Sequence, residues 1–383
     1  MLRGSPSPLA IVAVMYDIFL MNDRLLSTIA MASLTLVACR PPALVPNAPP
    51  LAAATAASAG RFVDSLAAAQ RLPGFAVTAS VGNSVVWRHA VGFADIAART
   101  PAATSTQFRI GSVSKLFTAT LLMRLAQTGL LDLDAPISRY VSVPPSFADV
   151  TLRQLAGHLG GVRHYRGNEF LSNTHYDSLT AALSVFLNDS LLARPGARYL
   201  YSSYGYNLLG VAIERATGIT FTRAMRRLVL EPLSLIGTTE DDKRSPHPNR
   251  ASLYMVSDGR ASPAPEDDLS GRWPSGGYVS TTDDLALFGR TVLAPGLLDN
   301  ESIRTMLTPQ RTTAGVSTNV GIGWRIGQDS TVGTFYHHGG TSNGGSAFLF
   351  VLPSRQLVIA MATNALAQLS ERDAIELAKR ILR

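Results

Sequence analysis

The chain has 383 residues, of which 46% are hydrophobic and 16% charged, so it can form one large folded core and is not a disordered chain. The formal net charge is +7, but the basic residues are scattered and their densest groups, such as Arg226-Arg227, are short, so a nucleic-acid interface is not indicated. A single cysteine excludes a disulfide framework, and the sequence has no metal-ligand motif and no Gly-rich phosphate loop, so we expect no metal and no cofactor.

The amino terminus has the layout of a secretory signal. Met-Asn-Asp-Arg at 21–24 precedes an apolar run at 25–38, and the preceding residues 1–20 are interpreted as an upstream extension with the true start at Met21. The run ends in Leu-Val-Ala-Cys, which resembles a bacterial lipobox and gives the lone Cys39 a use as the lipid-modified residue. We therefore expect a signal region at 1–38, with an ordinary secretory signal as the alternative.

The segment that follows is rich in Ala and Pro and has no hydrophobic period. Residues 39–60 are therefore predicted to be a lipidated cysteine followed by a linker, with the catalytic body at 61–383. Arg40 follows the cysteine, which favours the periplasmic face of the outer membrane. Contact with the membrane would be through the lipid anchor only.

Strand-like and helix-like patterns alternate unevenly along residues 61–383. Strands are predicted at 75–81, 84–93, 321–326, 346–352 and 357–362, with helices at 61–71 and 369–382 and mainly helical patterns at 115–307. Strands near both ends and helices between them predict an α/β (α+β) fold, in which both chain ends build one sheet and an all-α subdomain is inserted.

Ser112 and Lys115 form the first motif with chemical meaning. The chain has only three lysines, and Arg supplies nearly all of its positive charge, so a lysine at this position suggests proton transfer, which guanidinium cannot perform. A helix is predicted to start here, and residues at i and i+3 share one face, so the Lys115 amine can reach the Ser112 hydroxyl. Burial near positive charge would lower the lysine pKa towards that of a general base. The alternative is a capping serine followed by a chance lysine.

Two further clusters follow in order, Tyr-Ser-Ser at 201–203 and His-His-Gly at 337–339. With Ser112 and Lys115 they resemble the S-x-x-K, Y-x-N and K/H-x-G motifs of the penicillin-recognising serine hydrolases, which include class C beta-lactamases, D-Ala-D-Ala carboxypeptidases and related esterases. Residues 155–165 and 275–285 also resemble stretches of that family, so the resemblance covers roughly residues 61–383. It implies a mostly antiparallel five-stranded sheet beside an all-α subdomain, with the serine at their junction.

The resemblance also implies a role for each matched residue. Ser112 would attack a carbonyl carbon, while Lys115 and Tyr201 would share the proton taken from it, and which of the two is the base stays open. The backbone N–H groups of Ser112 and Gly340 would form the oxyanion hole.

Two matched residues of the third motif would complete the cleft. His337 would line its far wall and hold a carboxylate or the leaving group, and Gly339 would leave room for the substrate. The register of this motif is open by one residue, so His338 is the alternative to His337.

Ser203 stands where the lactamases carry Asn. A hydroxyl there is more similar to the mitochondrial beta-lactamase-like peptidase branch, so we expect a peptidase- or carboxypeptidase-like amide hydrolase acting on a small peptide, amide or ester substrate, with weak beta-lactamase or esterase activity at most. A non-catalytic binding protein on the same fold is the alternative, and a scaffold that forms oligomers is another.

A second serine motif is a decoy. Residues 340–344 match the G-x-S-x-G nucleophile elbow, which requires a strand before it, a helix after it and a later His. A strand is predicted to follow, and His338 is the last histidine of the chain, so the elbow is rejected.

Overall fold

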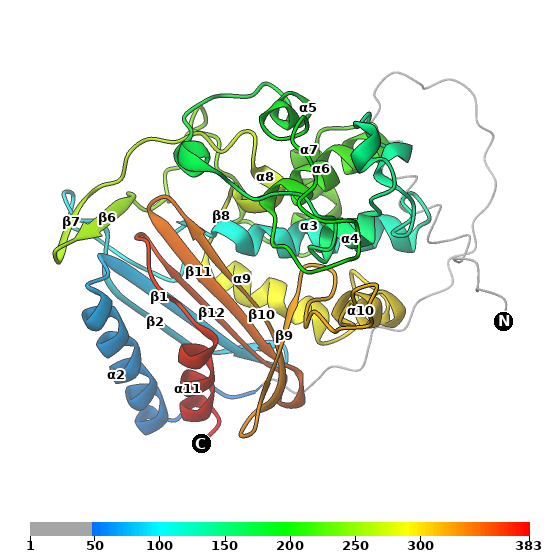
Figure 1. Ribbon diagram of the computed structural model, residues 1–383. Helices are drawn as coiled ribbons and strands as arrows, with labels where there is room; N and C mark the ends of the chain where they lie inside the picture. Colours follow the sequence, from blue (N-terminus) through cyan, green and yellow to red (C-terminus); the bar gives the residue numbers. More distant parts are fainter. Residues whose placement is uncertain (1–47) are drawn as a thin grey trace, which may run out of the picture.

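The computed structural model describes residues 48–383. The predicted signal region, Met21 and the lipidated Cys39 lie outside the described residues. Figure 1 shows a broad twisted sheet with two helices on one face and a mainly helical part on the other side.

The predicted fold class is confirmed, because one antiparallel sheet joins both ends of the described chain. Its order is β3-β2-β1-β12-β11-β10-β9, so the amino-terminal hairpin pairs directly with the last strand. The sheet has five long strands, of which β10 was not predicted, and short β3 and β9 extend its two edges. The strands are β1 (Gly74–Val81), β2 (Ser84–Asp95), β3 (Thr100–Pro101), β9 (Arg325–Asp329), β10 (Gly333–Ser342), β11 (Gly345–Leu352) and β12 (Leu357–Thr363).

One face of the sheet is covered by α2 (Ala53–Gln70) and α11 (Glu371–Ile381), which lie side by side in Figure 1. Alternate strand residues such as Phe350 and Ile359 pack there against Val63 and Leu377, all fully buried. Because strand side chains alternate between faces, the residues between them face the helical part.

The helical part contains α3 (Ser114–Gln127), α4 (Leu152–Ala156), α5 (Leu179–Ala182), α6 (Ser203–Thr217), α7 (Phe221–Met225), α8 (Trp273–Gly276), α9 (Thr282–Gly289) and α10 (Asn300–Leu307). It is not wholly helical, because β4 (Phe108–Arg109), β5 (Thr239–Glu240) and β8 (Tyr278–Ser280) form a small sheet, and β6 (Tyr254–Ser257) pairs with β7 (Arg260–Pro263).

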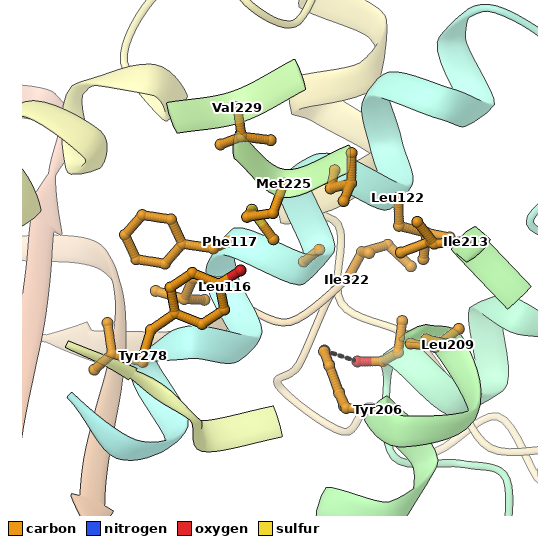
Figure 2. Packing of buried hydrophobic residues seen from close by; sticks show 14 of the residues in the cluster. Leu116, Phe117, Leu122, Tyr206, Leu209, Ile213, Met225, Val229, Tyr278 and Ile322 are labelled. Atoms are coloured by element: carbon orange, nitrogen blue, oxygen red, sulfur yellow. Dashed lines mark hydrogen bonds between the residues drawn. The ribbon is translucent and has the colours of Figure 1, made fainter. Parts of the chain in front are cut away.

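Helix α3 is central to this part and is buried on nearly all sides. Figure 2 shows Leu116, Phe117 and Leu122 of α3 packed among side chains of α6 and its neighbours, including Leu209 and Met225. A helix held from all sides cannot shift without opening cavities, so its first turn is a rigid platform.

Two predicted boundaries were wrong. The first helix begins at Ala53 and not at residue 61, so the described part of the predicted linker is helical from there, because Ala59 and Gly60 are buried by tertiary packing. The strand predicted at 321–326 lies instead at β9, because Gly323, at φ 81°, is in a turn that precedes it.

Candidate active site

Ser112 lies in a short 3-10 helix, η1 (Gly111–Val113), between strand β4 and helix α3. Gly111 makes this turn with φ 48°, and a Cβ there would lie 2.4 Å from the Thr341 carbonyl oxygen of β10. Glycine thus lets the segment that carries Ser112 approach the sheet, so Ser112 lies at the junction of the two parts, as expected.

The Lys115 amine is fully buried beside Ser112. Its Nζ lies 3.0 Å from Ser112 Oγ, 3.0 Å from Ser203 Oγ and 2.5 Å from the Ser275 carbonyl oxygen. No carboxylate in residues 48–383 pairs with it. Burial, and secondarily the charge of Arg325, lower the pKa of Lys115 well below its usual value, which favours the neutral amine.

A neutral amine fits these three contacts. It has two N–H donors, which suit the Ser203 hydroxyl and the Ser275 carbonyl, and one lone pair, which is left for the Ser112 hydroxyl proton. Lys115 is therefore placed to accept that proton.

Tyr201 contacts the same oxygen from the other side. Its phenol donates to Ser112 Oγ over 2.7 Å. Burial raises the pKa of Tyr201 above its usual value, opposed by the hydrogen bond to Ser112 and the charge of Arg325, so the phenol stays protonated. The Arg325 guanidinium carbon lies 5.4 Å from the centre of the tyrosine ring.

The structure corrects the position of His337. Its side chain lies on the far face of β10, where its ring stacks on Phe348 at 5.5 Å and Nε2 lies 3.6 Å from the Glu371 carboxylate of α11. His338, the alternative register, lines the cleft, since neighbouring strand residues face opposite sides. Its Nδ1 donates to the Gly339 carbonyl oxygen at 2.6 Å, and burial lowers the pKa of His338, so the ring is neutral there.

The same shift reassigns the glycines. A Cβ on Gly340 would lie 2.0 Å from the Ile110 carbonyl oxygen and 2.8 Å from Ser112 N, whereas one on Gly339 would point at Phe348 on the far face. The glycine needed for the close approach of β10 to the Ser112 segment is therefore Gly340. Gly339 lines the cleft with its backbone, but a side chain at this position would point away from the cleft.

The strand register also changes which residue can supply the second backbone N–H of the expected oxyanion hole, from Gly340 to Thr341. A two-residue turn joins Ser342 to Gly345, and in an antiparallel ladder only alternate residue pairs exchange hydrogen bonds. Counted from that pair, Gly340 bonds to β11 while the N–H and C=O of Thr341 face away from it. Thr341 N and O lie 2.6 Å and 2.4 Å from the Gly111 Cβ position, on the side of Ser112.

A cleft of about 240 Å³ opens over Ser112. Ser203 lines it, as expected from the sequence, but no Asp or Glu is among the described residues that line it. Its two guanidinium groups belong to Arg272 and Arg325. In the described part of the chain, Arg325 has no carboxylate partner, so its charge is available to a ligand.

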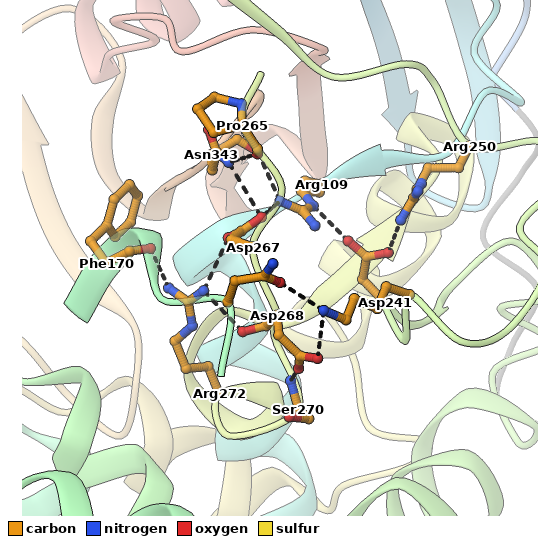
Figure 3. A network of polar contacts seen from close by, with 12 residues as sticks. Arg109, Phe170, Asp241, Arg250, Pro265, Asp267, Asp268, Ser270, Arg272 and Asn343 are labelled. Atoms are coloured by element: carbon orange, nitrogen blue, oxygen red, sulfur yellow. Dashed lines mark hydrogen bonds and ion pairs between the residues drawn. The ribbon is translucent and has the colours of Figure 1, made fainter. Parts of the chain in front are cut away.

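Arg272, in contrast, belongs to a buried ionic network (Figure 3). It pairs with Asp267 at 3.0 Å, and Asp267 pairs at 2.5 Å with Arg109 of β4. Arg109 also pairs with Asp241 and donates to the Asn343 carbonyl oxygen in the β10–β11 turn. The network therefore ties the strand before Ser112, the hairpin of the third motif and one cleft wall together.

Sequence reasoning identified Ser112, Lys115 and Tyr201, which the structure brings together, but it missed Arg272, Arg325 and the network. Arg109 bonds to Asp241 and Asp267, which are 132 and 158 residues away, so the network forms no sequence motif. The rejected serine elbow is followed by a strand, β11, as predicted; the elbow residues themselves form the end of β10 and the turn after it. No cluster of three metal-ligating side chains exists among the described residues.

Comparison with known proteins gives consistent results. The family model described as Beta-lactamase matches residues 59–382. The chain is 27% identical to the human serine beta-lactamase-like protein LACTB, mitochondrial, over 73% of this chain and 69% of the relative. It is 25% identical to penicillin-binding protein 4* of Bacillus subtilis, over 69% and 62%. Its fold is similar to that of a D-amino acid amidase from Ochrobactrum anthropi, with a TM-score of 0.74 and 22% identity over 86% and 98%.

Proposed function

Since this chain belongs to the beta-lactamase family of serine hydrolases, we propose that it forms an acyl-enzyme on Ser112 and cleaves amide bonds in small peptides that carry a free carboxylate. The observation that carries the proposal is the Lys115 amine, which is buried without a counter-ion among the described residues and lies 3.0 Å from Ser112 Oγ. A buried lysine of this kind is costly for folding and is suited to proton transfer.

Acylation begins when Ser112 Oγ attacks the carbonyl carbon and its proton passes to the neutral Lys115 amine. The Tyr201 phenol, 2.7 Å from the same oxygen, then gives its proton to the leaving nitrogen as the C–N bond breaks. The products are the acyl-enzyme, a free amine, a Lys115 ammonium and a Tyr201 phenolate. Burial raises the pKa of Tyr201 and so disfavours the phenolate, and the charge of Arg325 offsets part of that cost.

Deacylation reverses both proton transfers. Water attacks the ester carbonyl and gives a proton to the Tyr201 phenolate. As the C–O bond to Ser112 breaks, Lys115 returns its proton to Oγ, and the resting state is restored. In both halves the backbone N–H groups of Ser112 and Thr341 bind the oxyanion, and loss of one such donor costs about a hundred- to a thousandfold in rate.

Arg325 supports the choice of substrate. Its guanidinium is the cleft's cation without a carboxylate partner among the described residues, and no described acid lines the cleft. A carboxylate suits an unpaired guanidinium, because the fork of N–H donors can bind both oxygens. Peptides with a free carboxylate are therefore the preferred substrates, and esters and beta-lactams are secondary ones.

We also propose that the protein is exported and anchored by a lipid on Cys39, at the periplasmic face of the outer membrane. No helix in the described residues is long and apolar enough to span a bilayer. Radiolabelled palmitate should enter the wild-type chain, and label in Cys39→Ala would refute the anchor.

The direct test is an intact-mass time course of the full chain, carried out separately with benzylpenicillin and with a small fluorophosphonate. We expect a single adduct in the wild type and none in Ser112→Ala. Hydrolysis of an acetylated dipeptide should exceed that of its C-terminal amide. If neither reagent forms an adduct and the folded protein also leaves the peptide intact, the non-catalytic binding protein would be favoured.

A further inference from the structure

His158 has no role in the proton transfers described above, yet it is almost completely buried at the centre of the site. It ends helix α4 in the left-handed region, with φ 60°. Leu159 N–H donates to the Gln154 carbonyl at 2.7 Å and His158 N–H to the Leu155 carbonyl at 3.2 Å. These two bonds define the helix end at which glycine is usual, because a Cβ is disfavoured there.

A histidine in a glycine position suggests that its side chain is used. Three consecutive residues, Leu200, Tyr201 and Ser202, all contact His158. Leu200 N–H donates to the His158 carbonyl oxygen at 2.8 Å, and Ser202 N–H donates to His158 Nδ1 at 3.2 Å. Between them, the Tyr201 ring packs on the imidazole with 4.4 Å between ring centres.

We propose that His158 is the positioning residue of Tyr201: its carbonyl and Nδ1 hold the backbone on either side of the tyrosine, and its ring sets the direction of the phenol towards Ser112. This inference rests on the proposed acyl-enzyme function. The phenol must lie within hydrogen-bonding distance of both Ser112 Oγ and the leaving group, and a displacement of about 1 Å can cost a hundredfold in rate.

The protonation state of the imidazole fits this role. Nδ1 accepts a hydrogen bond from the Ser202 N–H, so the ring hydrogen is on Nε2, which has no partner among the described residues. Burial, and further the charge of Arg325, lower the pKa of His158 well below its usual value. The imidazole of His158 therefore stays neutral. Its Nδ1 remains a hydrogen-bond acceptor, and the ring adds no positive charge beside Lys115.

Two substitutions separate positioning from simple stability. His158→Gly suits the positive φ but removes both the acceptor and the ring. His158→Asn also tolerates positive φ, and its Oδ1 can take the place of Nδ1. With the acetylated dipeptide, whose leaving nitrogen takes its proton from Tyr201, we expect His158→Gly to lower kcat by about a hundredfold with KM within about twofold of wild type. His158→Asn should recover at least about tenfold of that loss.

Thr151→Ala is the matched control, because it removes the capping box at the other end of α4 without touching Tyr201. It should lower the melting temperature and leave kcat close to wild type. Wild-type kcat in a folded His158→Gly protein, or no gain in His158→Asn over it, would overturn the proposal.

A measurement independent of turnover keeps this inference separate from the proposed function. In protein labelled with [13Cζ]tyrosine, the Tyr201 signal is identified by its loss in Tyr201→Phe. We expect it to move in His158→Gly, to return towards its original position in His158→Asn, and to stay in place in Thr151→Ala. An unmoved signal in His158→Gly would refute the positioning role, whereas undiminished turnover in Ser112→Ala would refute the proposed function alone.

Discussion

Adding one methyl group at Gly340 should disable the site without removing any functional side chain. In Gly340→Ala the new Cβ would lie 2.0 Å from the Ile110 carbonyl oxygen and 2.8 Å from the backbone nitrogens of Ser112 and Val113. Ordinary contact begins at about 3.4 Å, so β10 and η1 must separate by about 1.4 Å. All of the close atoms are backbone atoms, which cannot rotate away. A shift of that size moves Ser112 relative to Thr341, and we expect kcat to fall by about a hundredfold or more.

Gly339→Ala is the matched comparison on the same strand. Its Cβ would meet Phe348 Cδ2 at 3.2 Å, a ring that can move by a few tenths of an ångström, so kcat should stay within about threefold of wild type. Both variants are measured by steady-state hydrolysis of a p-nitrophenyl ester and by thermal melting. Equal activity of the two variants would refute the assigned register, and so would greater damage from Gly339→Ala.

Three further predictions follow from the charges and the strand register. Arg325→Gln should lower kcat/KM for the C-terminal amide somewhat, because the charge beside Lys115 and Tyr201 is lost, and should lower kcat/KM for the same peptide with a free carboxylate by at least about tenfold more. Product chromatography measures both rates, and an equal loss for the two substrates would contradict carboxylate binding. Lys115→Met should abolish acylation in the mass assay yet raise the free energy of unfolding at neutral pH. The unfolded chain protonates this amine up to about pH 10.5 and the folded chain does not, so the wild type gains stability as pH rises towards 10.5 and the advantage of Met shrinks. His338→Ala should lower kcat while His337→Ala should not. The opposite result would mean that His337, and not His338, acts in the cleft.

The contact between Ser112 and Lys115 could be predicted from sequence because its geometry is local. Ser112 and Lys115 lie three residues apart where a helix begins, so one helical turn fixes their distance. Tyr201 could be added only through its resemblance to a family motif, since its contact with Ser112 spans 89 residues. The sheet was also accessible, because strand patterns at both ends of residues 61–383 predict that the ends pair.

The third motif shows where sequence reasoning fails. A shift of one residue on a strand moves every side chain to the other face, and two consecutive histidines followed by two glycines fit either register. The register is set by the turn at Asn343, which the network around Arg109 and Asp267 holds in place. Those contacts join segments more than 75 residues apart, so no local pattern reveals them.

The helix α2 shows a different limit. Its first turns are an alanine run with a weak hydrophobic stripe, which composition alone does not distinguish from a linker. Burial against the sheet decides the outcome, since Ala59 and Gly60 are buried and a Cβ on Gly60 would contact the His89 ring at 3.3 Å. Tertiary packing, and not local propensity, extends this helix towards the amino terminus.

Ser203 connects the lysine chemistry to substrate choice. Its hydroxyl contacts Lys115 Nζ at 3.0 Å and its backbone N–H donates to His164 Nδ1 at 3.3 Å, so both groups are already used within the protein. Among the described residues that line the cleft there is no Asn or Gln, and hence no side-chain amide to pair with the substrate's amide. Recognition must then depend on another group, and the guanidinium of Arg325, which pairs with no acid in residues 48–383, is the one available. A site built in this way should discriminate by the presence of a carboxylate more than by the amide bond itself, which explains why we expect weak turnover of uncharged esters beside efficient cleavage of short acidic peptides.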